Sequence, residues 1–438
     1  MNADEPSPKA YRRFFARIGI ATLCSIWSLW AFQAASGVSM PPTVEVVDQA
    51  KPNSVALQIT PKVTSKVSIE YGSSKFKLTN RTPIIELQAK ASHTFVLSSA
   101  RANSTIFYRV WYQERGASQF ATTAVKSLSL ASSNMNQVFA IEADPHMDEN
   151  SDAATFSATL SQIKAASPAF LMDLGDIFMV DKLPTKTDAN IRSRYQLMKS
   201  FYDQLGSTFP LYLTMGNHDG ETGYESLNTR SYRKEYFPAQ TGALNYYSFT
   251  SPNALYVVLD PFTYTTKKPN TDGWGWTLGK TQYDWLKTTL ESSAAQHKFI
   301  FIHHLVGGSD QARGGIEFAK FFEWGGLNKD GSFGFSQQRL GWAKPIHQLL
   351  VDNGVDAVFK GHDHFYAKQE LDGIVYQTLP QPSHPGDKLT SPAEYGYFSG
   401  DILGGSGYLK VTLSGATAKV EFVKSTGEIA ASYVMNDA

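Results

Sequence analysis

Histidine, aspartate and asparagine side chains gather in five short stretches of this sequence, and each stretch directly follows an apolar run. The stretches hold Asp144 and His146; Asp176; Asn217, His218 and Asp219; His303 and His304; and His362 and His364. Six of the ten histidines in the chain lie in these stretches, a concentration that core packing does not require. Imidazole mixed with carboxylate is typical of sites for zinc, manganese or iron. The pattern therefore predicts a metal site built from several separate segments.

The number of candidate ligands exceeds the need of one metal ion. Seven residues qualify: Asp144, His146, Asp176, Asn217, His303, His362 and His364. An open catalytic site uses about three protein ligands per metal, so seven predict two divalent ions that share a bridging carboxylate. Two-metal sites, with ions about 3.5–4 Å apart, are suited to in-line displacement at phosphorus. None of the five stretches contains cysteine or a G-x-S-x-G nucleophile motif.

The elements expected to position these residues form an α/β domain. From residue 136 onward, apolar strands alternate with helical patterns at 153–166, 193–205, 281–295 and 342–352. Gly206 and Gly354 follow two of these helices, where a left-handed residue commonly ends a helix. In α/β sheets the carboxyl ends of the strands gather at one edge, and ligands bind there. Glycines around Asn217-His218-Asp219 permit a tight turn at that edge.

The segment before this domain has a different pattern. Short period-2 runs at 44–47, 55–59, 67–71, 94–97 and 106–112 predict an all-β sandwich. Strand patterns return at 408–413, 419–423 and 430–434, and we expect edge strands of the second domain there. The predicted domains are residues 1–40, a signal or anchor segment; 41–130, the β-sandwich; and 131–438, the catalytic domain.

The N-terminus predicts export. A basic stretch with Arg12 and Arg13 precedes the apolar run 18–32 and the small residues 34–37, as in a signal peptide. The paired arginines are similar to a twin-arginine signal, and the alternative is a general secretory signal. We expect a periplasmic or extracellular protein, or a membrane-anchored one if the segment is not cleaved. The one cysteine, Cys24, lies in this segment, and the formal net charge of zero gives no nucleic-acid-binding signature.

The motifs resemble those of the calcineurin-like metallophosphoesterases. Asp-x-His, Gly-Asp, Gly-Asn-His-Asp, an isolated His and Gly-His-x-His occur here in that order over roughly residues 135–375. The resemblance implies a four-layer αββα sandwich. The stretch from His93 through Tyr108-Arg109-Val110 is loosely similar to the fibronectin type III module that precedes the catalytic domain in purple acid phosphatases.

The resemblance also implies a role for each residue. Asp144, His146 and His364 would hold one metal; Asn217, His303 and His362 would hold the other; and Asp176 would bridge them. A metal-bridging hydroxide would attack phosphorus. His218 would face the phosphate and stabilise the transition state or protonate the leaving oxygen, and Asp219 would orient the His218 ring.

Two positions near these motifs leave alternatives open. His303 and His304 point to opposite faces of a strand, so only one is expected to be a ligand, and the family pattern favours His303. His304 then lies near the substrate or is buried. Arg313, in a glycine-flanked loop after this strand, either binds the phosphate or is a solvated loop residue.

One departure from the purple acid phosphatases affects the expected metal. Those enzymes carry glycine at the position of His146 and an iron-ligating tyrosine three residues after the bridging aspartate, where this chain has Met179. We therefore expect a colourless hydrolase of phosphate esters that uses two divalent ions, manganese, zinc or iron. A phosphomonoesterase is favoured; the alternatives are a phosphodiesterase and a non-catalytic surface-binding protein. The natural substrate, small or macromolecular, and the oligomeric state do not follow from the sequence.

Overall fold

The computed structural model describes most of the chain after residue 39. The described residues are 40–48, 54–98, 105–129, 136–147, 151–206, 209–219, 231–237, 245–265, 273–308, 312–386, 389 and 392–436. The predicted export segment, apart from Met40, lies outside these residues, as do Arg12, Arg13 and Cys24. No helix among the described residues is both long and apolar enough to span a membrane.

Two antiparallel sheets form the N-terminal β-domain. One contains β1 (Thr43–Asp48), β2 (Ser54–Thr60) and β6 (His93–Ser98); the other contains β3 (Ser65–Gly72), β4 (Asn80–Arg81), β5 (Ile85–Leu87), β7 (Thr105–Glu114), β8 (Ala121–Thr122) and β9 (Lys126–Ser129). Leu57 and Leu97 of the first sheet share one buried core with Val67 and Val110 of the second. The predicted sandwich is therefore present, and its assignment as a fibronectin type III module stays a prediction.

Two larger sheets form the second domain. The first has the order β12 (Leu211–Leu213), β11 (Leu171–Asp173), β10 (Gln137–Glu142), β20 (Gly407–Ser414), β21 (Thr417–Lys424), β22 (Ile429–Asn436). The second has the order β13 (Tyr247–Thr250), β14 (Ala254–Val258), β15 (His297–Ile302), β16 (Ala357–Lys360), β18 (Ile374–Thr378), β17 (Tyr366–Leu371), β19 (Asp401–Leu403). The strands β10, β11 and β12 run parallel, as do β14, β15, β16 and β18.

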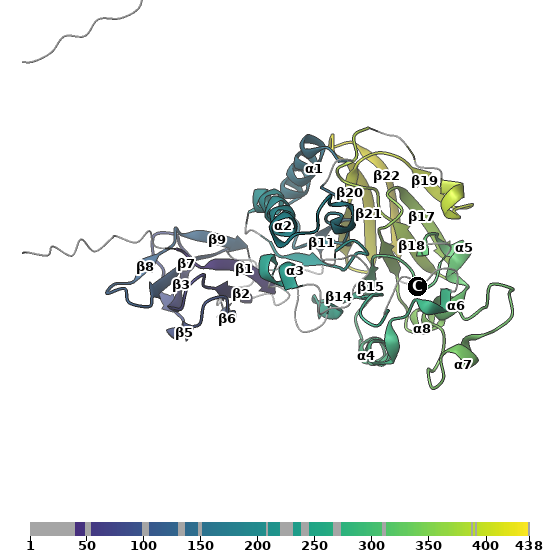
Figure 1. Cartoon of the computed structure of the whole chain (residues 1–438), viewed down its shortest axis with the longest axis horizontal. Coiled ribbons are helices and arrows are strands. Elements are labelled where there is room, and N and C mark those ends of the chain that lie inside the picture. Colours follow the sequence, from purple (N-terminus) through teal and green to yellow (C-terminus); the bar gives the residue numbers. More distant parts are fainter. Residues whose placement is uncertain are drawn as a thin grey trace, which may run out of the picture. The chain divides into compact units, whose positions relative to one another are not determined.

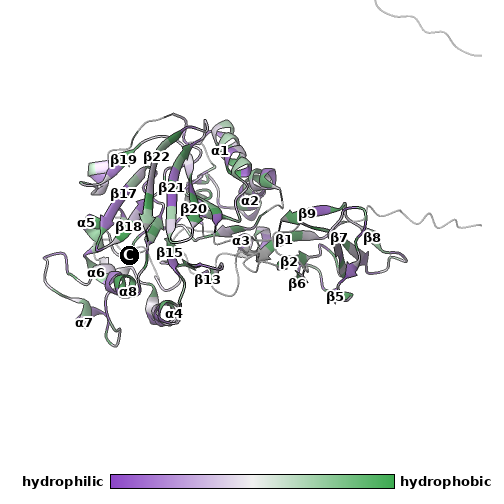
Figure 2. Cartoon of the chain, turned by 180° about the vertical axis from the view of Figure 1, so that it is seen from behind, coloured by the Kyte–Doolittle hydropathy of each residue, from purple (hydrophilic) through white to green (hydrophobic). Residues whose placement is uncertain are grey.

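Three buried cores separate the layers of this domain. Phe139 and Leu409 of the first sheet meet Phe301 and Phe359 of the second in the core between the sheets. On the outer face of the first sheet lie α1 (Ala153–Ala166) and α2 (Asp188–Tyr202), and over the second lie α4 (Gly279–Glu291) and α8 (Ile346–Asp352) (Figure 1). Hydrophobic and hydrophilic residues both occur along these helices, as expected for helices that pack on one face only (Figure 2). The αββα arrangement that the motifs implied is thus observed.

The helix predictions hold in position and differ at the ends. The helix α1 covers the predicted range, and Gly206 and Gly354 have the positive φ values of 73° and 62° expected after a helix. The helix α2 starts at Asp188, before the predicted 193, because the Thr187 hydroxyl caps it by accepting from the Asn190 N–H at 3.3 Å. The helix α8 starts after Pro345 rather than at the predicted residue 342. Proline lacks a backbone N–H and would interrupt a helix that began earlier.

The C-terminal strands correct one expectation. Only β22 lies at an edge of its sheet, whereas β20 pairs with β10 and β21, and β21 pairs with β20 and β22. A polar alternation such as that of β21 marks one covered face, and it does not distinguish an edge strand from an inner one. These strands complete the first sheet and leave β10 inside it.

Candidate metal centre

One group of candidate ligands contains Asp144 and His146, which follow β10, and His364. His364 lies in the turn after β16, residues 361–364, which is called the β16 turn below. The ligand atoms of Asp144, His146 and His364 lie within 4.8 Å of one another. The Nε2 atoms of His146 and His364 are 3.0 Å apart, and each lies about as far from Asp144 Oδ1, at 3.6 and 3.5 Å. The side chain of His364 is 33% exposed, so this group is open on one side.

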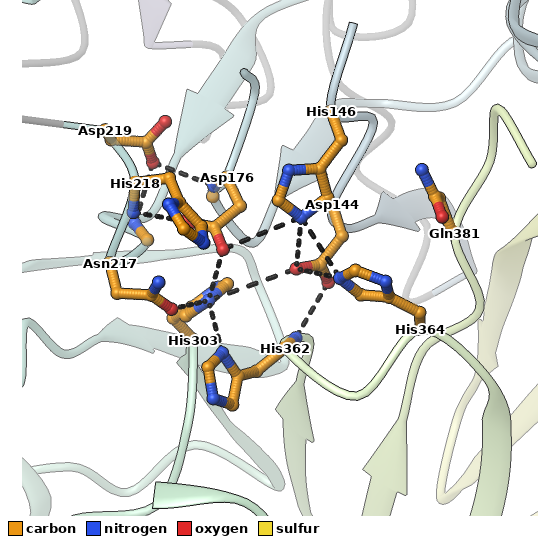
Figure 3. Close-up of polar contacts among 12 residues, drawn as sticks. Asp144, His146, Asp176, Asn217, His218, Asp219, His303, His362, His364 and Gln381 are labelled. Carbon is orange, nitrogen blue, oxygen red and sulfur yellow. Dashed lines mark hydrogen bonds and ion pairs between the residues drawn. The ribbon is translucent and has the colours of Figure 1, made fainter. Parts of the chain in front are cut away.

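The second group is buried. It contains Asp176, which follows β11, His303, which follows β15, and His362 of the β16 turn. His303 Nε2 lies 3.1 Å from Asp176 Oδ2 and 3.2 Å from His362 Nδ1. Asn217, from the turn after β12 (residues 216–219, hereafter the β12 turn), places its Oδ1 3.1 Å from the same His303 nitrogen. The structure thus brings all seven predicted ligands together (Figure 3).

Asp176 lies between the two groups. Its Oδ2 is 3.1 Å from His303 Nε2 and 3.7 Å from His146 Nε2, which belongs to the other group. Its Oδ1 accepts from the His218 backbone N–H at 2.8 Å. Contact with both groups is what a bridging carboxylate requires, and bridging itself stays a prediction.

The donor set fits bound cations. Asp144 Oδ1 is buried and accepts no hydrogen bond, yet it faces His146, His303 and His364 nitrogens at 3.5–3.9 Å. Ligand atoms about 2.0–2.2 Å from a shared ion lie about 3–3.6 Å from each other, and the distances given above within each group are 3.0–3.6 Å. The His303 Nδ1–H donates to the Leu174 carbonyl, 2.8 Å away, and this bond orients the ring as in known metal sites.

The charges of the site are strongly interdependent. Burial alone would raise the pKa of Asp144 and lower that of His303. The neighbouring histidines instead hold the pKa of Asp144 well below its usual range, and Asp176 raises the pKa of His303 to about 9. Burial and the nearby His303 lower the pKa of His362. Cations bound between these groups would displace the proton that His303 otherwise retains.

The backbone of the candidate ligands is unusual. Asp144, His146, Asp176, His362 and His364 all have positive φ, between 43° and 73°, and they make up half of the ten described non-glycine residues with positive φ. A left-handed residue costs about 1–2 kcal/mol unless it is glycine. Such strain clusters at functional sites, where the surrounding structure holds it in place.

The glycines next to ligands in these turns, Gly216 and Gly361, have a steric reason. A Cβ atom on Gly216 would lie 2.1 Å from Asp176 Oδ1, and one on Gly361 would lie 2.4 Å from Asp144 Oδ2. Both contacts are far inside van der Waals distance, so each turn can approach the opposing carboxylate only without a side chain. Close approach to a ligand, rather than a sharp turn alone, explains these two glycines.

His218 and Asp219 stand at the edge of this centre. The His218 ring lies 5.6 Å from that of His146. The Asp219 carboxylate accepts from the backbone N–H groups of Asp176, Ile177 and Gly216 at 2.9, 3.0 and 2.7 Å. It therefore ties the β12 turn to the turn after β11. The predicted orientation of the His218 ring by Asp219 stays a prediction.

The structure separates His303 from His304. His303 joins the second group, whereas the fully buried His304 ring lies against Phe262 and Trp276, with ring centroids 5.0 and 4.7 Å away. Burial, with the nearby His303, lowers the pKa of His304 to about 3. His304 is therefore buried, and its place near the substrate stays a prediction.

Arg313 lies at the β16 turn. It donates to the His362 carbonyl and to Asp363, and its guanidinium covers the Tyr395 ring. Its predicted contact with substrate stays a prediction.

Sequence reasoning missed two residues at this site. Gln381 is buried and donates to the Ser383 hydroxyl at 3.2 Å, and that hydroxyl donates to the Pro145 carbonyl between Asp144 and His146. Gln381 follows β18, whose carboxyl end lies next to that of β16, so a sixth apolar run ending in polar residues could have indicated it. Arg233, 1% exposed, donates to Asp219 and to the Thr214 carbonyl. It comes from α3 (Ser231–Tyr236), and no motif marks it.

Two solved structures with a similar fold cover most of this chain. The purple acid phosphatase PPD1 from yellow lupin (Lupinus luteus) seeds has a TM-score of 0.63 at 12% identity, covering 90% of this chain and 74% of that one. The structure of PhoD has a TM-score of 0.59 at 15% identity, covering 90% of each chain. At these identities the likeness shows the fold alone. Among curated protein sequences, none matches this chain significantly.

A family match covers the strands and turns that build the metal centre. Residues 138–366 match the family described as calcineurin-like phosphoesterase. This range starts in β10 and ends just after the β16 turn, so it includes all seven candidate ligands together with His218 and Asp219. The chain belongs to the calcineurin-like phosphoesterase family.

Proposed function

We propose that this protein is an exported metal-dependent phosphoesterase that hydrolyses phosphomonoesters at a dinuclear centre. The observation that carries the proposal is the pair of ligand groups, Asp144–His146–His364 and Asp176–His303–His362, with the Asp176 carboxylate in contact with both. Two divalent ions held there would polarise the phosphoryl oxygens and lower the pKa of a water molecule between them. Export rests on the N-terminal sequence pattern alone.

The residues of the chain would divide the remaining work. Asp176 Oδ1 accepts a hydrogen bond from the His218 backbone N–H, which fixes the backbone from which the His218 ring extends. The His218 ring, partly exposed beside His146, is placed to contact a phosphate oxygen or the leaving group. Monoesters are favoured because one structural neighbour is named a phosphatase. Met179, three residues after Asp176, offers no phenolate, so we expect no purple absorption.

A His218→Ala substitution tests the proposal. The variant should retain the metal content of the wild type, measured by elemental analysis, and lose about 10²–10⁴-fold in kcat on a chromogenic monoester. The wild type should lose activity on chelation and regain it with manganese, zinc or iron. A wild type that binds no metal would contradict the dinuclear centre, and a fully active variant would contradict the role of His218. A diester substrate measured in parallel decides between monoesterase and diesterase.

A further inference from the structure

The β16 turn contains an aspartate that is not among the candidate ligands. Asp363 lies between His362 and His364, and its side chain is fully buried. Its Oδ2 accepts from Lys360 Nζ at 2.9 Å, from the Tyr397 hydroxyl at 2.6 Å and from the Gly314 N–H at 3.3 Å. Asp363 therefore anchors the turn to the protein around it while its two neighbours serve the metal centre.

Arg313 binds the same turn at two points. Its Nη1 donates to the His362 carbonyl at 2.8 Å and to Asp363 Oδ1 at 3.0 Å, and its guanidinium lies 4.2 Å from the centroid of the Tyr395 ring. On the other side of the same residue, the His362 N–H donates to Asp144 Oδ2 at 2.8 Å. His362 is thus held between a ligand of the other group and the Arg313 guanidinium.

The turn needs such support because its conformation is strained. His362 and His364 have φ values of 73° and 65°, each costing about 1–2 kcal/mol. The two residues belong to different ligand groups. A relaxation of the turn would therefore displace one ligand of each group at the same time.

We propose that Arg313 is a positioning residue that holds the β16 turn in its strained form and so sets the metal affinity of both ligand groups together. The inference rests on the metal centre of the proposed function. It gives Arg313 a task distinct from the phosphate contact expected from the sequence, because the guanidinium is committed to the His362 carbonyl, Asp363 and Tyr395.

The test is an Arg313→Met substitution studied without substrate. Metal-free protein is titrated with Mn²⁺ or Zn²⁺ against a chromophoric chelator, which gives an affinity for each site. Both affinities should weaken about tenfold or more, the usual effect of removing a residue that orients a ligand. At saturating metal, KM should remain close to that of the wild type. Wild-type affinities at both sites would overturn the proposal, and a raised KM alone would assign Arg313 to the substrate.

Arg339→Met is the matched control. Arg339 also pairs with a buried carboxylate, Glu323, and its Nη2 donates to the carbonyls of Trp274 and Trp276 at 2.7 and 3.0 Å. None of these partners is a candidate ligand, so this variant should lose stability and keep the metal affinities of the wild type. Equal weakening in both arginine variants would contradict a specific role of Arg313.

A milder variant covers the case in which Arg313→Met does not fold. Arg313→Lys keeps the charge and loses the planar fork, so it should weaken both sites by a smaller factor than Arg313→Met. Unchanged affinities in this variant would count against the proposal. Failure of the wild type to bind two ions would instead contradict the proposed dinuclear centre, so the two ideas fail separately.

Discussion

The β12 and β16 turns each contain a buried aspartate that is not a candidate ligand, and the two aspartates are stabilised in different ways. Asp219 of the β12 turn accepts mainly from three backbone N–H groups, and the Arg233 guanidinium lies 3.3 Å away. Asp363 of the β16 turn accepts from two cationic side chains, Arg313 and Lys360, and from a tyrosine hydroxyl. One turn is held mainly by backbone groups and the other mainly by side chains, although the Gly314 N–H also donates to Asp363.

The two turns also differ in how the negative charge of the nearby buried carboxylates is neutralised. Burial raises the pKa of Asp173 to about 7. Hydrogen bonds from Tyr202 and Gly175 and the charge of Arg233 lower this pKa but do not offset the effect of burial. Burial and the nearby Asp173 raise the pKa of Glu142 as well. Burial would also raise the pKa of Asp363, but Lys360 holds it below its usual range. Behind the β12 turn the carboxylates are balanced partly by protons, and at the β16 turn by fixed cations.

The largest expected effect is that of Asp219→Ala compared with Asp363→Ala. Loss of the Asp219 carboxylate leaves three backbone N–H groups and a buried guanidinium without their acceptor, and none of these can turn to water or lose a proton. We expect a loss of about 3–5 kcal/mol in the free energy of unfolding. Asp363→Ala should cost less, because its donors are mostly flexible side chains. Urea unfolding of the metal-free proteins at pH 7 measures both, and an equal or reversed cost would contradict the comparison.

The second expected effect concerns the arginines. Arg233 is 1% exposed and faces Asp219, whereas the side chain of Arg313 is 22% exposed and Asp363 retains Lys360 without it. Arg233→Met should therefore reduce the free energy of unfolding by about 3 kcal/mol, as for a broken buried pair. Arg313→Met should reduce it by about 1 kcal/mol. Thermal and urea unfolding of the pair would contradict the comparison if Arg313→Met were the less stable variant.

The contrast between the turns also explains which parts of the site the sequence could predict. Ligands that follow apolar strands, such as Asn217 and His303, were predictable because parallel strands bring their ends to one edge. The residues that hold the ligand turns in place were not predictable from the sequence. Arg233 lies on a short helix whose sequence shows no recognisable motif. Asp363 lies between His362 and His364, and because the two histidines already accounted for the Gly-His-x-His motif, no role was assigned to the aspartate. Such residues act through buried contacts made by distant segments, and local periodicity does not report these contacts.

The fold shows the same division. The predicted range of α1 matches the observed one, and in the structure the Asp152 side chain caps the helix by accepting from the Thr155 N–H. The position of β20 inside its sheet was not predicted, because hydrogen bonding on both sides of a strand depends on chain topology. Strand pairing between segments about 270 residues apart, as for β10 and β20, leaves no local signal.

The smallest expected effect is a gain in stability from Asp173→Asn. The folded pKa of Asp173 is about 7, against about 3.9 for an unfolded aspartate. Between these values the native state binds a proton that the unfolded state lacks, so this residue lowers the free energy of unfolding as the pH rises from about 4 to 7. Asparagine does not ionise and still offers one acceptor to Tyr202 or Gly175. The advantage of the variant over the wild type should therefore grow as the pH rises, by on the order of 2 kcal/mol between pH 5 and pH 8.

Asp363→Asn provides the opposite case in the same experiment. The pKa of Asp363 is already lowered, so its carboxylate is charged throughout pH 5–8 and its contribution is lost only on further acidification. Asp363→Asn should therefore be less stable than the wild type by a nearly constant amount across this range. Urea unfolding at pH 5, 6.5 and 8 measures both differences. Equal destabilisation of Asp173→Asn at all three pH values would show that Asp173 does not bind a proton in the folded protein. The two turns would then differ only in which groups donate hydrogen bonds to their buried aspartates.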